Sequence, residues 1–251
     1  MKDPTHPHPP GSHRGASKTI ESTARALRKM FGAVAPRYDF LNHFLSLGRD
    51  VAWRKATAET LRSVLERPGS SVADLCCGTG DLAFELEYYS AGKVFGTDFC
   101  RPMLLLAKRK ARRRSTLFLE ADTLALPFPD AILDLVTLAF GFRNLASYAR
   151  GLEEIRRVLK PRGLLAILEF SEVRGMLFGP LFRFYFRNLL PRIGTWVSGV
   201  PGPYQYLHDS VAKFPNQQAL ADLLNAQGFR NVRYVNFTGG IAALHLAEKA
   251  A

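Results

Sequence analysis

The stretch VADLCCGTGDLA, residues 72–83, constrains the fold of this chain more than any other. A short apolar run ends at Asp74, turns on Gly78 and Gly80, and passes into a helical pattern. Glycine has no Cβ, so such a turn can take a positive φ and bring its backbone close to a ligand. Turns of this kind join a strand to a helix in open α/β sheets that bind nucleotide cofactors. The stretch therefore predicts a cofactor cradle.

Strand and helix patterns alternate after this turn. We expect strands at residues 71–76, 93–98, 116–120, 133–139 and 163–170. Helical patterns cover residues 81–88, 101–112, 147–159 and 217–226. Two further β-rich runs, 232–237 and 242–248, must pair antiparallel, because the link between them is far shorter than a parallel crossover. The order predicts an α/β, Rossmann-like fold of the class I methyltransferase type, with a seven-stranded, mostly parallel sheet and a C-terminal antiparallel hairpin.

The segments around this sheet differ from it in composition. Residues 1–20 are rich in proline and predict a disordered tail, and residues 21–251 predict a single domain. Its first part, 21–68, predicts a helical cap. Residues 172–215 predict a helical insertion before the last helix, on the substrate side. In it, the apolar stretch 177–189 carries two arginines, which argues against a membrane span. An amphipathic lid or interfacial helix and a plain core helix with exposed arginines both stay open.

Charge and cysteine usage narrow the partners. The 251-residue chain has a formal net charge of +12, and residues 108–114 read KRKARRR. Such a chain attracts nucleic acid, an acidic membrane surface or a phosphorylated substrate. The cysteines are Cys76, Cys77 and Cys100, with no CxxC spacing and no histidine placed to complete a zinc site. We therefore expect a reduced, cytoplasmic protein with no metal, in which the cysteines are small, buried apolar side chains.

Acidic residues at strand ends discriminate between two cofactors. A dinucleotide also binds at a glycine turn, and Ala83 is an accepted variant of its third glycine. Asp81, however, would repel a pyrophosphate at the helix N-terminus. The methionine moiety of S-adenosylmethionine, with its sulfonium and ammonium groups, suits Asp74, and Asp81 is a second candidate for it. The ribose suits Asp98, and the adenine amino group suits Asp122. These positions favour S-adenosylmethionine over NAD, with helix capping as the alternative role for each aspartate.

Longer motifs resemble one family. They are DLCCGTGDLA, GTDFCRPML, LPFPDAILDLVTLAFGFRN, RVLKPRGLLAILEFS and NFTGGIAALHLAEK, within residues 30–249. With YQYLHDSVAKFP, they resemble the ubiquinone/menaquinone biosynthesis C-methyltransferase family. The resemblance implies methyl transfer from S-adenosylmethionine to a ring carbon of a prenylated quinol. Demethylmenaquinol is the expected acceptor, and the 2-methoxy-6-polyprenyl-benzoquinol precursor of ubiquinone is the alternative.

The resemblance also implies cofactor contacts. Thr79, Asp98, Asp122 and Thr123 match the family's cofactor-contacting positions. Ala139 stands where the family often has a serine, so one hydroxyl contact is missing. Together with the turn and strand-end residues, the expected cofactor site comprises Asp74, Gly78, Thr79, Gly80, Asp98, Asp122, Thr123 and Ala139.

Carbon methylation of a quinol requires a ring hydroxyl that is wholly or partly deprotonated. Arg143, at the carboxyl end of the fourth predicted strand, is expected to donate to this oxygen and lower its pKa. Asn144 is expected to orient the same oxygen. Tyr38, in the helical cap, is the third expected catalytic residue. The general base stays open, with His208 of the insertion as a candidate, because histidine is a common general base near neutral pH.

Two other functions stay open at this point. The net charge and the basic run 108–114 suggest an RNA or DNA methyltransferase. Enzymes that methylate exocyclic amines usually carry a polar-Pro-Pro-aromatic tetrapeptide, where this chain has FGFR at 140–143, so we expect no nucleic acid partner. A non-catalytic cofactor-binding module is the other alternative. The isoprenoid tail of a quinol predicts peripheral contact with the inner face of a membrane, and a homo-oligomer is compatible with the sequence.

Overall fold

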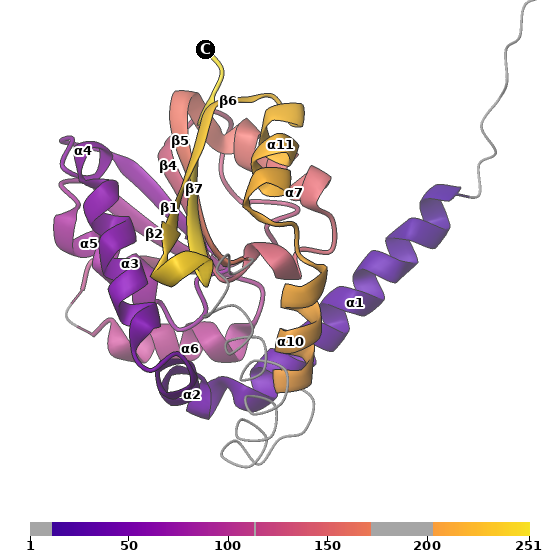
Figure 1. Ribbon diagram of the computed structural model, residues 1–251. Helices are drawn as coiled ribbons and strands as arrows, with labels where there is room; N and C mark the ends of the chain where they lie inside the picture. The colour runs from indigo at the N-terminus through magenta and orange to yellow at the C-terminus, as the bar shows by residue number, and fades with distance from the viewer. Residues whose placement is uncertain (1–11, 113, 172–202) are drawn as a thin grey trace, which may run out of the picture.

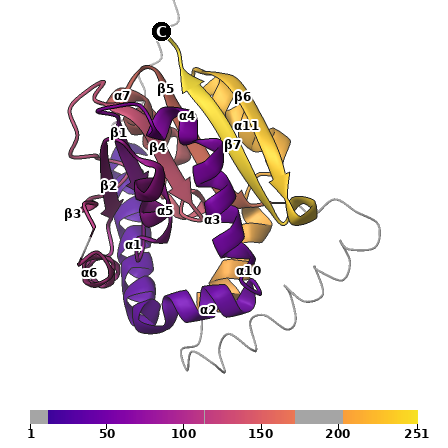
Figure 2. The ribbon, with the colours of Figure 1, turned by 90° about the vertical axis from the view of Figure 1, so that its left-hand side faces the viewer.

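One mixed sheet lies at the centre of the computed structural model, which describes residues 12–112, 114–171 and 203–251. Within these ranges its strands are β1 (Ser71–Leu75), β2 (Lys93–Asp98), β3 (Leu117–Glu120), β4 (Leu133–Ala139), β5 (Leu159–Phe170), β6 (Phe229–Phe237) and β7 (Ala242–Lys249). Their order is β3-β2-β1-β4-β5-β7-β6. Strand β7 runs antiparallel to β5 and β6, and the other pairs are parallel. Figure 2 shows β3 at one edge and the β6–β7 hairpin at the other, which confirms the predicted α/β fold.

Two strands begin earlier than the sequence predicts. Strand β5 begins at Leu159, which pairs with Leu133 ahead of a register shift. Arg162 has a φ of 61°, so the chain turns there before the strand continues. Strand β6 begins at Phe229, and Asn231, with a φ of 53°, lies at an irregularity in its pairing with β7. The alternation of apolar and polar residues predicts only the regular part of a strand, so it does not reveal the residues that pair before a register shift.

Helices cover both faces of the sheet (Figure 1). One face carries α3 (Arg49–Thr60), α4 (Arg62–Leu65), α5 (Asp81–Tyr89) and α6 (Arg101–Lys110). The other carries α7 (Tyr148–Val158) and α11 (Gln217–Ala226). In α7, Leu152, Ile155 and Val158 form a buried stripe at helical spacing. Each fully buried side chain of this kind contributes about 1.5–3 kcal/mol through removal of its apolar surface from water.

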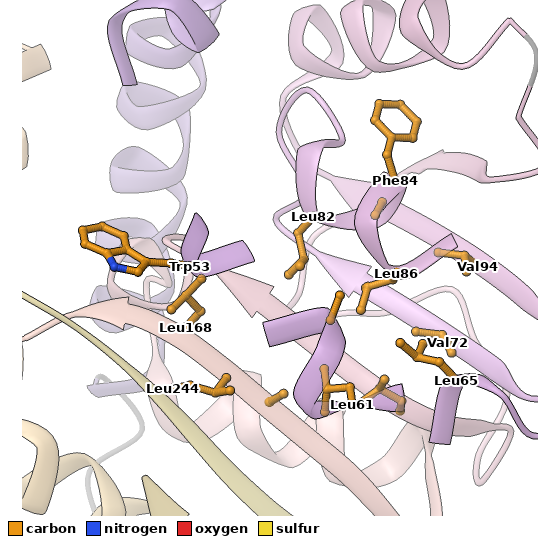
Figure 3. Close-up of a cluster of buried hydrophobic side chains, with 14 of the residues drawn as sticks. Trp53, Leu61, Leu65, Val72, Leu82, Phe84, Leu86, Val94, Leu168 and Leu244 are labelled. Carbon is orange, nitrogen blue, oxygen red and sulfur yellow. The ribbon is translucent and has the colours of Figure 1, made fainter. Parts of the chain in front are cut away.

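The core on the α3–α5 side fixes the helices that surround the glycine turn. Leu86 of α5 lies with Val72 of β1 and Val94 of β2 (Figure 3). Trp53 of α3 belongs to the same cluster, and its Nε1 donates to Thr238 Oγ1 at 2.9 Å. This bond joins α3 to the turn between β6 and β7, and α3 also packs against α5.

Helices α1 (Ser12–Val34) and α2 (Tyr38–Leu45), joined by the 3₁₀ helix η1 (Ala35–Arg37), form the N-terminal part of the described chain. Helix α1 begins inside the predicted tail 1–20, because no proline interrupts the chain between positions 10 and 36. Residues 1–11 lie outside the described residues. The start of α1 projects from the domain, whereas its other end approaches α6 and α10 (Figure 1).

Helix α10 (Pro203–Lys213) is the helix described within the predicted insertion 172–215. The predicted amphipathic stretch 177–189, with Arg183 and Arg187, lies outside the described residues. Helix α10 contacts α1 and the 3₁₀ helix η2 (Phe142–Asn144) that follows β4. In the described part of the chain, no helix combines the length and the apolar character needed to cross a bilayer.

Candidate functional site

Strands β1 and β4 are neighbours whose following segments leave toward opposite sides of the sheet. Such a switch point opens a crevice at the carboxyl ends of the strands, where ligands bind in open α/β folds. Cys76 follows β1 with a φ of 51°, and Phe140 follows β4 with a φ of 59°. These left-handed conformations are strained for residues with a Cβ and are concentrated at functional sites. A Cβ on Gly141 would lie 2.4 Å from that of Cys76, so only glycine allows the two segments to approach.

Two cavities open at this switch point and share part of their walls. Of the predicted cofactor residues, the larger cavity is lined by Gly78, Asp98, Asp122, Thr123 and Ala139. The smaller cavity is lined by Asp74, Gly78, Thr79 and Ala139. Tyr38, Cys76, Gly78 and Ala139 line both cavities, so the two form one continuous site. Among the predicted cofactor residues, only Gly80 lines neither of these cavities.

The two glycines of the turn have different roles. Gly78 has a φ of 57°, and a Cβ placed on it would have Tyr38 Cε1 as its nearest neighbour, at 3.9 Å. Gly78 therefore presents bare backbone to the cavity. Gly80 has a φ of 89°, and its Cβ would lie 2.9 Å from Phe118 Cζ and 3.1 Å from the Phe84 ring. Gly80 is thus required for packing at the N-terminus of α5, and its predicted contact with a cofactor stays a prediction.

We expect Gly80→Ala to lower the free energy of unfolding by roughly 1–3 kcal/mol, because it combines a positive φ with overpacking. Gly69→Ala is the matched control, since Gly69 has a φ of 74° and nothing within 4 Å of its Cβ position. Urea unfolding of both variants separates the two costs. Equal losses in the two variants would contradict the packing role of Gly80.

Asp98 ends β2 at the rim of the larger cavity. Its Oδ2 accepts a hydrogen bond from Gly78 N at 2.8 Å, and its Oδ1 accepts one from Cys100 N at 2.7 Å. Burial raises the pKa of Asp98 to about 6, although both backbone donors favour the ionised carboxylate. The carboxylate therefore ties the glycine turn to β2 and lies where a ribose would meet it.

Asp122 and Thr123 follow β3 on the same side of the larger cavity. Asp122 is exposed, and its Oδ1 accepts from Leu124 N at 2.9 Å. Thr123 is buried, with its Oγ1 3.5 Å from Cys76 Sγ. Ala139 closes β4 and supplies a small apolar wall. Asp122 lines the larger cavity, so its predicted contact with the adenine amino group stays a prediction that the geometry permits. Its hydrogen bond from Leu124 N also stabilises the turn after β3.

Asp74 lies deeper, on the smaller cavity. It is only 1% exposed, and its Oδ1 accepts from Thr137 Oγ1 at 2.8 Å. Among the described residues, its Oδ2 has no hydrogen-bond partner. Burial raises the pKa of Asp74 to about 7, against the opposing effects of Thr137 and the Arg54 charge. A buried carboxylate with an unsatisfied oxygen is suited to bind a cationic group of a ligand.

Thr79 takes part in a polar cluster that we call the Lys110 cluster, made of Asp39, Thr79, Asp81 and Lys110. Lys110 Nζ lies 2.7 Å from Asp39 Oδ2, 2.6 Å from Asp81 Oδ1 and 3.1 Å from Thr79 Oγ1. The Thr79 hydroxyl also donates to Asp39 Oδ1. The cluster joins α2 to the glycine turn, α5 and α6. Because Lys110 compensates Asp81, the expected repulsion of a pyrophosphate by Asp81 loses its basis, and within the described site the choice of cofactor rests on the buried carboxylate of Asp74.

Lys110→Met is expected to weaken S-adenosylmethionine binding by roughly threefold to tenfold, because Asp39 and Asp81 lose their shared cation and α2 loses its hold on the turn. Lys108→Met, at an exposed position of the same helix, is the control. Calorimetric titration of the cofactor checks both variants. Unchanged affinity in Lys110→Met would show that the cluster does not support the site.

Arg143 lies in η2 and is held in a buried ion pair. Its Nη1 lies 2.6 Å from Glu169 Oε1 and donates to Phe140 O at 2.6 Å. The side chains of Arg143 and Glu169 are 6% and 1% exposed. The guanidinium carbon also lies 5.4 Å from the centre of the Phe170 ring. Arg143 does not line either cavity, so its predicted contact with a substrate oxygen stays a prediction.

Asn144 and Tyr38 both line the larger cavity. Asn144 Oδ1 accepts from Tyr206 Oη of α10 at 2.9 Å, and Asn144 Nδ2 donates to Phe140 O at 3.5 Å, which leaves the second N–H of the amide as a donor. Burial raises the pKa of Tyr38, against the opposing positive charges of Arg143 and Arg54. Tyr38 is therefore protonated at neutral pH and can donate a hydrogen bond.

The remaining titratable candidates lie elsewhere or are inert. His208 Nδ1 lies 3.0 Å from Asp209 Oδ1 in α10, and neither side chain lines the two cavities. Burial raises the pKa of the thiols of Cys76 and Cys77, so these groups are not thiolates at neutral pH. Across 12–112, 114–171 and 203–251, no three His, Cys, Asp or Glu side chains gather as a metal site.

The sequence analysis missed four polar residues of the site. They are Arg54, Lys110, Glu169 and Tyr206. Glu169 carried a signal, because an acid inside the apolar run AILEF must be paired when buried. Arg54, in AWRKATAET, looks like an ordinary exposed arginine, and only the fold places it against the cavity.

The fold is that of class I methyltransferases that use S-adenosylmethionine. The bare backbone of Gly78, the unsatisfied oxygen of Asp74 and the carboxylate of Asp98 fit this cofactor. A solved S-adenosylmethionine-dependent methyltransferase from Aquifex aeolicus shares the fold, with a TM-score of 0.56 and 22% identity. That match covers 76% of this chain and 88% of the other.

The chain belongs to the ubiE/COQ5 methyltransferase family, which it matches over residues 18–249. It is 47% identical to a demethylmenaquinone methyltransferase of Thermus thermophilus, over 88% of this chain and 100% of that protein. It is 39% identical to a ubiquinone/menaquinone biosynthesis C-methyltransferase UbiE of Geotalea uraniireducens, over 89% and 96% respectively. The chain is therefore an S-adenosylmethionine-dependent C-methyltransferase of quinone biosynthesis, as its motifs predicted.

Proposed function

We propose that the protein methylates a ring carbon of demethylmenaquinol. The Thermus thermophilus relative, which this chain matches at 47% identity over the whole length of that relative, is named for demethylmenaquinone. The structural observation that carries the proposal is the presence of Tyr38 and Asn144 in the wall of the larger cavity, with the buried Arg143–Glu169 ion pair at η2 beside them. This arrangement offers donors to a ring oxygen beside the cofactor site. The benzoquinol precursor of ubiquinone is the alternative acceptor.

The chemistry requires negative charge to develop on the quinol ring. When bound, S-adenosylmethionine would supply an electrophilic methyl group, with its sulfonium becoming a neutral thioether as the S–CH3 bond breaks. The methylated ring carbon then loses its proton to solvent, which restores the aromatic ring. Tyr38, protonated because of its raised pKa, donates to the ring oxygen and stabilises the phenolate. The Arg143 guanidinium, oriented by Glu169, adds positive potential near the same oxygen. Asn144, oriented by Tyr206, contributes its amide N–H as a second donor.

Apolar side chains support the choice of a hydrophobic acceptor. The walls of the larger cavity include Leu27 and Phe31 of α1, and Leu145 after η2. Placement of the ring against rigid walls aligns its carbon with the methyl group, and alignment alone can lower a barrier by several kcal/mol. A nucleic acid acceptor is not favoured, because the named relatives act in quinone biosynthesis.

The proposal is tested with methyl-labelled S-adenosylmethionine and two short-chain acceptors, demethylmenaquinol and the demethyl benzoquinol precursor of ubiquinone. We expect label in menaquinol at a kcat/KM at least tenfold above that for the benzoquinol. A preference for the benzoquinol would overturn the choice of acceptor. Label in neither quinol, with cofactor binding intact, would overturn the proposed reaction.

We also propose that the protein contacts the inner face of an anionic membrane through the basic end of α6. Lys108 and Arg109 of α6 and Arg112 of the turn after it are exposed, and each is worth about 1 kcal/mol near an anionic surface. Charge reversal of all three residues is expected to abolish cosedimentation with phosphatidylglycerol vesicles. With phosphatidylcholine vesicles, the wild-type protein is expected to stay in the supernatant when the vesicles are sedimented. Equal binding to both vesicles would contradict this contact.

A further inference from the structure

The smaller cavity has walls of opposite charge. Arg54, from α3, lines it on one side, and Asp74, from the end of β1, lines it on another. Both side chains belong to buried residues, which are 7% and 1% exposed. Charged groups so far from water require a partner or a function, because their burial is costly.

Arg54 is held in one orientation from behind. Its Nη1 pairs with Asp50 Oδ2 at 2.5 Å, and its guanidinium carbon lies 5.6 Å from the centre of the Phe140 ring. Asp50 is itself fixed, because its carboxylate accepts from Ser46 Oγ at 2.6 Å and lies 2.8 Å from His43 Nδ1. Asp50 thus positions the guanidinium and neutralises its charge without using all of its donors.

Each of the two charged groups keeps one unsatisfied atom. Within the described residues, Arg54 Nε and Asp74 Oδ2 are both buried and without a hydrogen-bond partner. The described contacts include no ion pair between the two side chains. One cavity therefore offers an unused cationic donor and an unused anionic acceptor. An α-amino acid end, with one carboxylate and one ammonium group, complements this pair.

We propose that Arg54 binds the α-carboxylate of S-adenosylmethionine while Asp74 binds its α-ammonium group. Arg54 then makes the site selective for cofactors with an intact amino acid end. The inference rests on the cofactor and is independent of the acceptor quinol, so it is tested by binding alone. Arg54 lies on α3, outside the glycine turn and the strand ends, so the selectivity comes from the helical cap.

Three ligands separate the contributions of the two groups. S-Adenosylmethionine has both charged groups, decarboxylated S-adenosylmethionine keeps the amine and lacks the carboxylate, and 5′-methylthioadenosine lacks the whole amino acid end. We expect the wild-type protein to bind S-adenosylmethionine roughly 10- to 100-fold more tightly than the decarboxylated form, since a charge-assisted hydrogen bond is lost. Calorimetric titration measures all three affinities.

Arg54→Met should remove this preference and leave the affinity for 5′-methylthioadenosine within about twofold of wild type. Asp74→Asn should instead weaken the binding of both amine-containing ligands and leave the ratio of their two affinities unchanged. Because Arg54→Met strands the buried Asp50 carboxylate, the double variant Asp50→Asn/Arg54→Met is measured beside it, and Asp50→Asn alone is the control. A uniform loss for all three ligands in the double variant, or an unchanged ratio, would overturn the proposal and leave Arg54 a structural residue.

Discussion

Arg143→Ala is expected to reduce methyl transfer by roughly 100-fold or more and to lower the free energy of unfolding by about 3–5 kcal/mol. The stability loss follows from Glu169, whose side chain is 1% exposed and would lose its ion-pair partner. The activity loss follows from the positive charge that Arg143 supplies beside Tyr38. Steady-state kinetics and urea unfolding measure the two effects, and S-adenosylmethionine affinity is expected to stay within about twofold of wild type.

The two effects are separated by the double variant Arg143→Met/Glu169→Gln. It removes both charges and keeps an acceptor for Phe170 N, which donates to Glu169 Oε1 at 2.8 Å. We expect it to recover most of the stability and none of the turnover. Recovery of both would show that the ion pair is structural and would remove Arg143 from the reaction.

The cofactor-free protein is expected to lose stability as the pH rises from about 4 to about 7. Burial raises the pKa of Asp74 to about 7 and that of Asp98 to about 6. The folded state therefore binds more protons than the unfolded chain across this interval, and the stabilising contribution is complete below pH 3.8 and lost above the folded pKa values. For Asp74 the loss amounts to about 4 kcal/mol.

Asp74→Asn should flatten this dependence, because it removes one of the two raised carboxyl groups. Urea midpoints at pH 5 and pH 8 provide the comparison, with Asp130→Asn as the control at a side chain that is 78% exposed. Binding of S-adenosylmethionine to the wild type should tighten over the same interval, since its ammonium group favours the ionised Asp74. An unchanged slope in Asp74→Asn would contradict the buried, protonated state of this carboxyl.

The sheet could be predicted because each of its signals is local in sequence. The glycine turn follows an apolar run directly, and Asp98 ends a strand that periodicity identifies. The carboxyl ends of adjacent parallel strands meet at one edge of the sheet. The strand pattern alone therefore predicts that Asp74, Asp98 and Thr123 lie around one site, and all three line the two cavities. The short link before β7 also fixed its antiparallel direction.

Contacts between distant segments could not be predicted from periodicity. Lys110 pairs with Asp81, which lies 29 positions away in the sequence. The expectation that Asp81 alone would repel a pyrophosphate therefore does not hold. Arg143 meets Glu169 across 26 positions, so a residue predicted to face the substrate is held in an ion pair. Arg54 reaches the cofactor cavity from α3, a helix whose sequence carries too weak an amphipathic pattern to show which of its side chains are buried.

The position of the transferred methyl group on the quinol tests C-methylation by this protein most directly. The protein is incubated with S-adenosylmethionine carrying a ¹³C methyl group and with demethylmenaquinol, and the product is examined by carbon NMR and mass spectrometry. We predict one added methyl group, with its signal in the region of methyl groups on a ring carbon. A methoxy signal, or no labelled quinol from protein that binds S-adenosylmethionine, would contradict quinol C-methylation at this site.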